Sequence, residues 1–247
     1  MVSVAIITKN EEKNISKCLE SLLWADEIIV VDSGSTDKTI DICKKYKCKI
    51  IQTDWKGFGK NKQYAVKHTS NDWVLSLDAD EIVSPSLAKA IIKTVKLNEK
   101  LGYRIKRNSF YLGKLIKFSG WQNDYPLRLF NKKYGNFNDF SVHESVIMPE
   151  EVVAKINSPI IHFPYNKIED HLNKINNYSS LAAENLLTKD KTIFYPYAFI
   201  AGAFKFLRVY FLKLGFLDGK EGLILAILSA YYVFLKYIKL WLMKNKK

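Results

Sequence analysis

The 247-residue chain is poor in the residues that mark the specialised protein classes, with 3 cysteines, 6 prolines and 11 glycines. The cysteines, Cys18, Cys43 and Cys48, form no Cys-x-x-Cys pair, which excludes a disulfide framework and indicates a reducing compartment. So little proline and glycine excludes collagen-like and low-complexity chains. With 48% hydrophobic residues, the chain is expected to form one large domain, or one domain with an appendage.

The first residues also lack the features of a signal peptide. The stretch MVSVAIITKNEE has no basic region followed by a long apolar run and a small-residue cleavage site. We therefore expect the chain to begin as a folded element and to stay in the cytoplasm.

Acidic residues are in deficit: 25 Asp and Glu stand against 38 Lys and Arg, a net charge of +13. Such an excess indicates an anionic partner, which can be nucleic acid, anionic lipid or a phosphorylated substrate. From Lys191 to the end the net charge is +8, so most of the excess lies in the tail.

Four short apolar runs rich in β-branched residues recur in the first third of the chain: Val2–Ile7, Glu27–Val31, Lys49–Gln52 and Trp73–Leu77. Helical patterns separate them. Residues Glu11–Trp24 place Ile15, Leu19, Leu22 and Leu23 on one face, and Asp37 can cap a helix over Lys38–Tyr46. This alternation predicts an α/β protein with a Rossmann-like, open, mostly parallel sheet, which binds ligands beyond the carboxyl ends of its strands.

The pattern changes after about Pro85. One more helix is expected over Leu87–Leu97, and then mixed β structure up to His162. A further helix is predicted from Lys167 to about Leu187. Its expected start is a capping-box-like pair, Asn166 and Glu169, and its expected inner face consists of Ile168, Leu172, Ile175 and Leu181.

Acidic and hydroxyl residues follow each of the four predicted strands. The loops contain Thr8–Glu12, Asp32–Asp37, Asp54 and Asp78–Glu81. Each alone is explained as a helix N-cap. Together they concentrate carboxylates at the edge where this kind of sheet binds its ligand, which favours a nucleotide with a divalent metal ion.

The segment Asp78-Ala79-Asp80-Glu81 is the strongest motif, because it follows the apolar run WVLSL directly. Carboxylate oxygens suit Mg²⁺ or Mn²⁺, which bind one or two carboxylates together with phosphate oxygens. The chain has no G-x-G-x-x-G after the first run, and Gly57–Asn61 has the wrong spacing for a P-loop. A dehydrogenase and a P-loop kinase are therefore disfavoured.

Three segments, VSVAIITKNEE, VVDSGSTDKT and LDADE, resemble the family-2 glycosyltransferases. The resemblance implies the GT-A fold and an inverting enzyme that uses a nucleotide-diphosphate sugar. Four later segments, RLFNK, SVHESV, IIHFPY and GFLDGKEG, resemble the branch that adds β-glucose or a related sugar to the lipopolysaccharide inner core.

The resemblance implies roles for individual donor-site residues. Thr8, Asn10 and Glu11 would line the nucleotide pocket, Asp32 would accept a hydrogen bond from uracil, and Asp78 would face the ribose. Lys60 or Lys62 would lie near the nucleotide or its diphosphate, although both can instead be solvated helix charges. Asp80 would bind the metal, with His162 near the metal or the diphosphate unless it is a core residue.

An inverting transfer also needs a carboxylate that takes the proton of the acceptor hydroxyl. Asp124, Asp139 and Glu144 are candidates. The resemblance selects Glu144, which follows His143 in SVHES; the alternative is a surface acid at a β-edge. We expect Trp121, Asp124, Arg128 and His143 to shape the sugar and acceptor side, although a buried tryptophan in a core is the more frequent arrangement.

The tail contains two apolar, aromatic segments, Tyr195–Leu217 and Gly222–Met243, separated by Asp218–Glu221. The longest uncharged run in the second segment is shorter than the roughly 20 residues that a membrane span needs. Narrow polar stripes, Lys205 with Arg208 and Ser229 with Lys236 and Lys239, predict amphipathic helices that lie in the membrane interface with their lysines towards anionic headgroups. The alternative is a helical hairpin packed on the catalytic domain or on another subunit.

The sequence thus predicts a GT-A catalytic domain over 1–165, with a nucleotide-binding half (1–85) and an acceptor half (86–165), and a helical membrane-associating extension over 166–247. The predicted enzyme is metal dependent, peripheral and not bound to nucleic acid. It moves a hexose, such as glucose, from a UDP-sugar to a glycolipid at the cytoplasmic face of a bacterial inner membrane. One alternative is an NDP-sugar nucleotidyltransferase, but TKNEEKN is not the Gly-rich basic loop it needs. The other is a non-enzymatic basic adaptor for membrane or nucleic acid.

Overall fold

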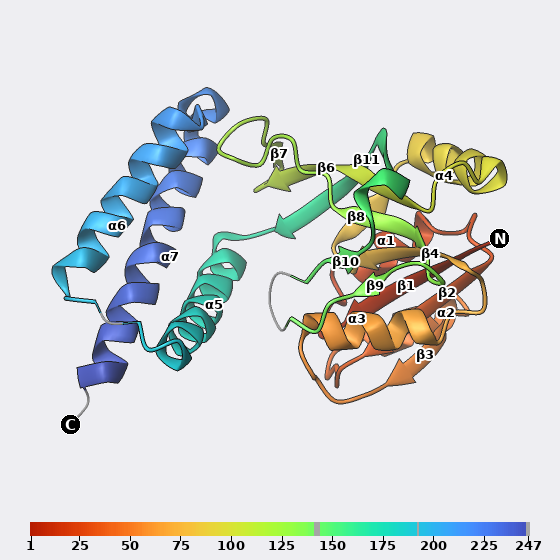
Figure 1. Ribbon diagram of the computed structural model, residues 1–247, viewed down its shortest axis with the longest axis horizontal. Helices are drawn as coiled ribbons and strands as arrows, with labels where there is room; N and C mark the ends of the chain where they lie inside the picture. The colour runs from red at the N-terminus through yellow and green to blue at the C-terminus, as the bar shows by residue number, and fades with distance from the viewer. Residues whose placement is uncertain (141–143, 192, 246–247) are drawn as a thin grey trace. The chain divides into compact units, whose positions relative to one another are not determined.

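The computed structural model describes residues 1–140, 144–191 and 193–245 (Figure 1). The chain forms two compact units. The N-terminal unit consists of Met1–Asn108 and Asn123–His162, and the C-terminal unit consists of Ser109–Gln122 and Phe163–Lys247. The segment 109–122 thus groups with the C-terminal helices, although it is flanked on both sides by residues of the N-terminal unit. A functional boundary at residue 165 stays a prediction.

Four parallel strands form one half of the sheet, in the order β3-β2-β1-β4. They are β1 (Val2–Thr8), β2 (Glu27–Asp32), β3 (Lys49–Gln52) and β4 (Trp73–Asp78). All four coincide with the predicted apolar runs to within one residue. All seven residues of β1 are buried, as expected of a parallel strand that is covered on both faces.

The sheet continues with the order β8-β6-β11-β5. These strands are β8 (Leu127–Asn131), β6 (Gly102–Tyr111), β11 (Val153–Tyr165) and β5 (Glu81–Val83). The pairs β4–β8, β6–β8 and β11–β5 are antiparallel, so the sheet is mixed. The short strand β7 (Lys114–Leu115) pairs with β6, and β9 (Asn136–Phe137) pairs with β10 (Val146–Ile147).

Helices cover both faces of the parallel strands. On one face α1 (Ile15–Glu20), α2 (Thr39–Lys45) and α4 (Pro85–Leu97) share a core with Val4 and Ile6 of β1. On the other face α3 (Phe58–Lys67) packs with Ala5 and Ile7. Because successive strand residues point to opposite faces, one strand supplies both cores.

The first helix is shorter than predicted, and this changes one residue's environment. Residues Ile15, Leu19 and Leu22 are fully buried, as expected. Leu23 is 76% exposed, so its prediction was wrong: α1 ends at Glu20, and beyond its end the chain no longer follows the helical period.

The C-terminal unit contains three long helices: α5 (Ile168–Thr188), α6 (Pro196–Leu207) and α7 (Gly219–Asn245). A π-helical turn (Arg208–Leu212) and a 3-10 turn (Gly215–Asp218) join α6 to α7. Helix α7 packs against both α5 and α6. The predicted break at Asp218–Glu221 is thus displaced, because Lys220 and Glu221 lie in the first turn of α7.

Helix α5 differs from its prediction in its start and in its buried face. The backbone N–H of Lys167 donates to the carboxylate of Asp170 at 3.1 Å, where Asn166 and Glu169 were expected. Leu172 and Leu181 are 39% and 49% exposed. The buried residues are His171, Ile175, Ser179 and Ala183, because α7 packs on a face offset from the most apolar one.

One helical segment in the described residues, Gly215–Asn245, is long and apolar enough to cross a membrane by length and composition, with a mean hydropathy of 1.7 in its best window. Only 22% of that window is buried inside the protein. The segment is therefore more apolar than its longest uncharged run, Gly222–Leu235, alone suggested.

Candidate active site

The ends of β1, β2 and β4 bring Thr8, Asp32 and Asp78 to one edge of the sheet. Thr8 pairs in register with Asp32, and Ile7 pairs with Asp78. Asp32 is fully buried, and both of its carboxylate oxygens accept from the backbone N–H of Ser35, at 2.9 and 3.0 Å. The buried Thr8 Oγ1 has no hydrogen-bond partner within the described residues. Buried polar atoms are normally satisfied, so this hydroxyl is suited to a ligand.

The loops that follow β1 and β2 are held together by hydrogen bonds. The Asn10 Oδ1 atom accepts from the backbone N–H of Thr36, and the Asn10 N–H donates to Ser35 Oγ, both at 2.8 Å. Asn10 has φ +57°, in the left-handed region that asparagine tolerates. The Glu11 carboxylate accepts from Asn14 Nδ2 at 2.7 Å. These two predicted nucleotide residues thus also organise the loops.

Lys62 lies between two predicted site carboxylates. Its Nζ is 2.8 Å from Asp78 Oδ1 and 2.6 Å from Glu144 Oε1, and its side chain is 3% exposed. Helix α3 supplies Lys62, and the loop that leads to Glu144 packs close to the start of that helix. A Cβ on Gly59 would lie 2.2 Å from the carbonyl oxygen of Asn138, so only glycine permits this approach. Lys60 is exposed on the same helix.

Two arginines extend this network away from Lys62. The Arg128 Nη2 atom donates to Asp78 at 2.5 Å and to Glu81 at 2.9 Å. Arg107 Nη1 donates to the fully buried Glu81 at 3.1 Å, and its Nε donates to Asp124 at 2.7 Å. Cations and carboxylates therefore alternate from Glu144 to Asp124. Sequence reasoning missed Glu81 and Arg107; the acid adjoining Asp80 was a signal for the first, whereas nothing local marked the second.

The charge state of this network follows from its pairings. Burial alone would raise the pKa of Asp78, but attraction by Arg128 and then by Lys62 outweighs it and holds that pKa well below its ordinary value. Burial opposes the charge on Arg128, yet Asp78 and Glu81 raise the pKa of its guanidinium. Both groups are thus charged at neutral pH, as buried ion pairs require.

Asp80, in the turn between β4 and β5, lies close to His162 of β11. Strand β11 runs antiparallel to β5 with His162 opposite Glu81, and His162 Nε2 lies 3.6 Å from Asp80 Oδ2. Within residues 1–140, 144–191 and 193–245, no group of three or more His, Cys, Asp or Glu side chains is arranged to hold a metal. One carboxylate and one imidazole still fit a cation of the Mn²⁺ type that takes its other ligands from phosphate and water.

The remaining predicted residues are dispersed. Asp139 is exposed and accepts from Gln63 Nε2 at 2.6 Å. Trp121 belongs to the C-terminal unit, where its ring meets that of Tyr111 edge-on with centroids 6.0 Å apart. His143 lies outside the described residues.

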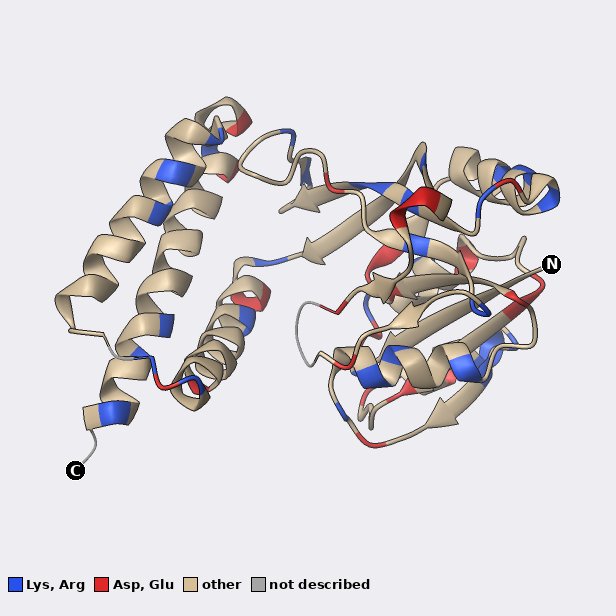
Figure 2. Ribbon diagram, in the orientation of Figure 1, with Lys and Arg blue, Asp and Glu red and all other residues tan. Residues whose placement is uncertain are grey.

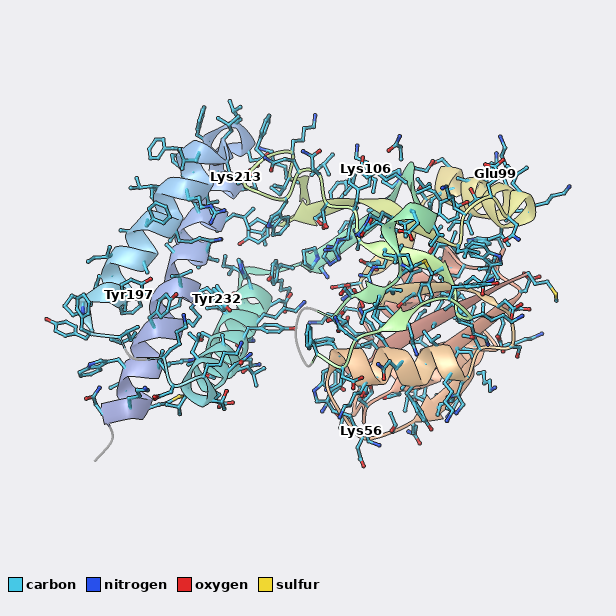
Figure 3. All side chains as sticks on the ribbon, viewed as in Figure 1. Lys56, Glu99, Lys106, Tyr197, Lys213 and Tyr232 are labelled. Carbon is cyan, nitrogen blue, oxygen red and sulfur yellow. The ribbon has the colours of Figure 1, made fainter. Side chains whose placement is uncertain are left out.

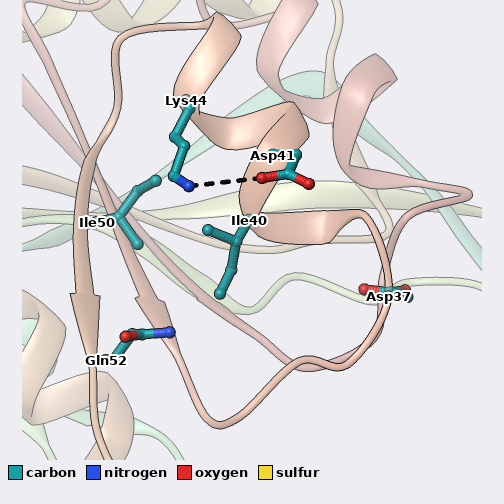
Figure 4. A pocket seen from close by; sticks show the side chains of 6 residues that line it. All are labelled: Asp37, Ile40, Asp41, Lys44, Ile50 and Gln52. Carbon is teal, nitrogen blue, oxygen red and sulfur yellow. Dashed lines mark hydrogen bonds and ion pairs between the residues drawn. The ribbon is translucent and has the colours of Figure 1, made fainter.

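A surface pocket lies near α2 and β3 (Figure 4). Its lining residues are Asp37, Ile40, Asp41, Lys44, Ile50 and Gln52. None of them is a predicted site residue or a member of the network around Lys62. Its exposed Lys44–Asp41 pair, 3.5 Å apart, is a surface ion pair, and such pairs contribute little to the stability of the fold.

Residues 3–150 match the sequence profile of Glycosyl transferase family 2. The chain belongs to glycosyltransferase family 2. This membership favours the predicted enzyme over the nucleotidyltransferase and the adaptor. Together with the mixed sheet it also confirms the GT-A fold class with a C-terminal helical extension.

The similarity to curated glycosyltransferases covers nearly the whole chain. An uncharacterized glycosyltransferase of Rickettsia typhi is 33% identical and aligns with 97% of this enzyme and 86% of its own length. The lipopolysaccharide core biosynthesis glycosyltransferase LpsC of Rhizobium meliloti is 29% identical, over 97% of this glycosyltransferase and 92% of LpsC. Among solved structures, that of S. aureus TarS has a TM-score of 0.50 at 17% identity, covering 97% of this chain and 54% of TarS. This last likeness concerns the fold alone.

Proposed function

We propose that this glycosyltransferase moves a hexose, such as glucose, from a UDP-sugar to a glycolipid acceptor of the lipopolysaccharide-core type, with inversion at the anomeric carbon. The observation that carries the proposal is the meeting of the family-like segments at one sheet edge, where Thr8 pairs with Asp32 and the neighbouring Ile7 pairs with Asp78. The similarity to LpsC, whose name specifies lipopolysaccharide core biosynthesis, supports the acceptor class.

On the donor side, Thr8, Asn10, Glu11 and Asp32 bind the nucleoside and Asp78 faces the ribose. The unsatisfied Thr8 Oγ1 supports this, because a nucleotide would provide its missing partner. Lys62 is the better of the two lysine candidates for the diphosphate. It is buried in the network, whereas Lys60 is an exposed residue of the same helix.

Asp80 and His162 hold a divalent cation, Mn²⁺ or Mg²⁺, together with the donor diphosphate. The metal would supply positive charge that neutralises the departing diphosphate. The 3.6 Å between the Asp80 carboxylate and the His162 imidazole supports one shared ion.

Glu144 takes the proton of the attacking acceptor hydroxyl. The hydroxyl oxygen attacks the anomeric carbon on the face opposite the diphosphate, the bond to the diphosphate breaks, and the proton passes to Glu144. The contact with Lys62 supports this assignment, because it connects Glu144 to Asp78 and hence to the donor edge of the sheet. Asp139, in contrast, is bonded to Gln63.

Asp124, His143 and Trp121 contribute to the acceptor side. Arg128, first expected there, acts in this proposal by holding Asp78 and Glu81, since its Nη2 is bonded to both. Asp124 is oriented by Arg107.

The C-terminal helices attach the enzyme to the cytoplasmic face of the inner membrane as a peripheral protein. Helices α6 and α7 carry few charges along their length (Figure 2). Large apolar side chains, including Phe199, Ile200 and Phe204, are 57%, 61% and 60% exposed, and aromatic side chains project along the same helices near Tyr197 (Figure 3). Exposed apolar surface of this extent marks a membrane or protein interface.

An interfacial position suits α7 better than a membrane span. Lys239 Nζ donates at 2.8 Å to Asn176 Oδ1, Ser179 Oγ and Ser180 Oγ of α5. The sequence pattern predicted that Lys239 faces lipid headgroups. In the structure it binds polar groups of α5 instead. Lys244 likewise pairs with Asp190 at 2.7 Å. A helix tied to a polar neighbour in this way is not surrounded by acyl chains.

The proposal is tested first by donor binding. A thermal-shift panel of UDP-, GDP- and CDP-sugars with Mn²⁺ should single out a UDP-sugar, since a ligand at 100 times its Kd stabilises the fold by ~2.7 kcal/mol, or about 5–10 °C here. Adding a lipopolysaccharide-core glycolipid should then release UDP. A shift with GDP- or CDP-sugars alone would refute the donor assignment, and UDP release without sugar transfer would refute the acceptor.

A further inference from the structure

The turn that contains Asp80 is closed by a carboxylate to which the proposed reaction assigns no role. Glu81, the first residue of β5, is fully buried. Its Oε2 atom accepts from the backbone N–H of Asp78, the last residue of β4, at 3.0 Å. The side chain of Glu81 thus joins the two ends of the turn in which Asp80 lies.

Two arginines bind the other oxygen of the same carboxylate. Glu81 Oε1 accepts from Arg128 Nη2 at 2.9 Å and from Arg107 Nη1 at 3.1 Å. Arg128 belongs to β8 and Arg107 to β6, and these two strands pair with each other. A buried carboxylate is stable only when donors and opposite charges satisfy it, and these groups do so. The turn is therefore fastened to the antiparallel part of the sheet.

Glu81 is also the backbone partner of His162. In the antiparallel pairing of β5 with β11, His162 lies directly opposite Glu81. The His162 imidazole in turn lies 3.6 Å from the Asp80 carboxylate. One residue thus adjoins Asp80 in the chain and His162 across the sheet, and both of its carboxylate oxygens are bound in place.

Glu81 is not suited to bind the metal itself. Its two oxygens already accept from three N–H groups, and two of these belong to the guanidinium groups of Arg107 and Arg128. Positive charges at this distance oppose the approach of a further cation. Metal ligands in proteins are, however, commonly oriented by partners that do not touch the metal, and loss of such a partner typically costs ~10–100-fold in metal affinity.

We infer that Glu81 is a positioning residue, which holds Asp80 and His162 at the separation that one shared Mn²⁺ ion requires. This inference rests on the proposed function, which assigns the ion to those two residues. Glu81 acts through the backbone of the turn and through the pairing of β5 with β11, and it contacts neither the metal nor the donor.

The test compares Glu81→Gln with Glu27→Gln in the full-length enzyme. Glutamine keeps the size of the side chain at position 81, but its NH₂ group must face either the Asp78 N–H or the arginines, so one attachment is lost. Glu27 is the matched control. It also accepts from a backbone N–H, that of Ser70, at 2.7 Å, and from the Ser3 hydroxyl at 2.5 Å. It begins β2, at the sheet edge opposite to the proposed site.

The decisive measurement is the affinity for Mn²⁺, which needs no turnover. The Kd of Mn²⁺ in the presence of UDP, obtained from the paramagnetic resonance signal of the free ion, should rise about tenfold or more in Glu81→Gln. It should stay within about twofold in Glu27→Gln. The Kd of UDP in EDTA should stay within about twofold in both variants, at a temperature at which circular dichroism shows each to be folded. A merely structural role would not change metal affinity alone.

The outcomes separate this inference from the function on which it rests. An unchanged Mn²⁺ Kd in folded Glu81→Gln overturns the positioning role, and so does an equal weakening of UDP binding with EDTA and with Mn²⁺. If Glu81→Gln fails to fold, Arg107→Lys takes its place, because lysine keeps the charge but lacks the fork that binds Glu81 and Asp124 together. Its Mn²⁺ Kd should rise about threefold, and an unchanged value overturns the inference. If the wild type and Glu27→Gln bind no Mn²⁺ with UDP, the metal assignment of the proposed function fails instead.

Discussion

Lys62 and Glu144, which are 82 residues apart in the chain, form an ion pair of 2.6 Å, and the same ammonium lies 2.8 Å from Asp78. One buried cation thus connects the end of a central strand with the loop that carries the proposed base. Glu144, Lys62 and Asp78 therefore form one chain of charges. Substitutions in this chain should be distinguishable by their effects on donor binding, on turnover and on the stability of the fold.

Replacing Glu144 by glutamine should separate chemistry from binding. The substitution keeps the size of the side chain and removes its ability to accept a proton. We expect kcat to fall by ~10²–10⁴ while the UDP-sugar affinity stays within a few-fold. Steady-state kinetics with donor binding by calorimetry measures both.

The matched controls for Glu144 are Asp124→Asn and Asp139→Asn, which remove the other two candidate carboxylates. Both should retain more activity than Glu144→Gln. If either one abolishes transfer with donor binding intact while Glu144→Gln stays active, the role of base passes to that aspartate.

Asp80→Ala should abolish metal-dependent transfer and weaken binding of UDP in the presence of Mn²⁺. The reason is the loss of the carboxylate that lies 3.6 Å from His162. Titration with Mn²⁺, followed by activity and by UDP binding, measures the effect. Asp72→Asn, which changes an acid paired with Lys133 at the surface, is the control. Wild-type turnover in Asp80→Ala would remove the metal assignment.

Lys62→Met should destabilise the N-terminal unit by about 3 kcal/mol at pH 7, because it leaves two carboxylates without their shared cation. The folded-state pKa of Asp78 is depressed, so its contribution to stability is present above about pH 4 and is lost as the pH falls through the folded-state pKa. The difference between variant and wild type should therefore shrink at pH 3. Urea unfolding at both pH values measures it, with Lys60→Met as the control. Equal losses in the two variants would contradict the pairing.

His171 should make the C-terminal unit sensitive to acid. Its Nδ1 is 2.9 Å from Tyr111 Oη, and burial, followed by repulsion from Lys174, lowers its pKa to about 4. The unfolded chain binds this proton near pH 6.5, so stability is full above that pH and falls by up to about 3 kcal/mol as the pH drops to 4.

Thermal unfolding between pH 7.5 and pH 4 checks the acid sensitivity. His171→Gln should flatten the slope between pH 6.5 and pH 4, whereas His68→Gln should keep it. A slope that survives in His171→Gln would assign the acid sensitivity to another group.

Membrane attachment should depend on basic residues of α6, the π-helical turn and α7, among them Lys205, Arg208 and Lys236, for which the described residues show no ion pair. At about 1 kcal/mol per basic residue near an anionic surface, reversing all three to glutamate should weaken binding to anionic vesicles by ~100-fold or more. Flotation at low salt measures it. Lys239→Gln, which loses bonds to α5, should still float if it folds. Full flotation of the triple variant would refute the electrostatic part of the proposal.

The sequence alone determined the parallel half of the sheet and the edge at which its acidic residues meet. Runs such as Val2–Ile7 and Trp73–Leu77 are apolar except for one serine each, and a strand buried on both faces needs such a composition. The acids after these runs reach the same sheet edge because parallel strands end on the same side. Short-range information was sufficient there, since each strand and its loop are contiguous in the chain.

The tertiary structure decided everything that depends on pairing between distant segments. The inner face of α5 was predicted from its leucines, yet His171 and Ser179 are buried because α7 packs on that side. Lys239 looked like a headgroup-facing lysine, and Asn176 and Ser179 of α5 bind it instead. Arg107 carried no local signal. Its role comes from Glu81 and Asp124, partners that only folding brings within hydrogen-bonding distance, because a buried charge is stable only where such partners surround it.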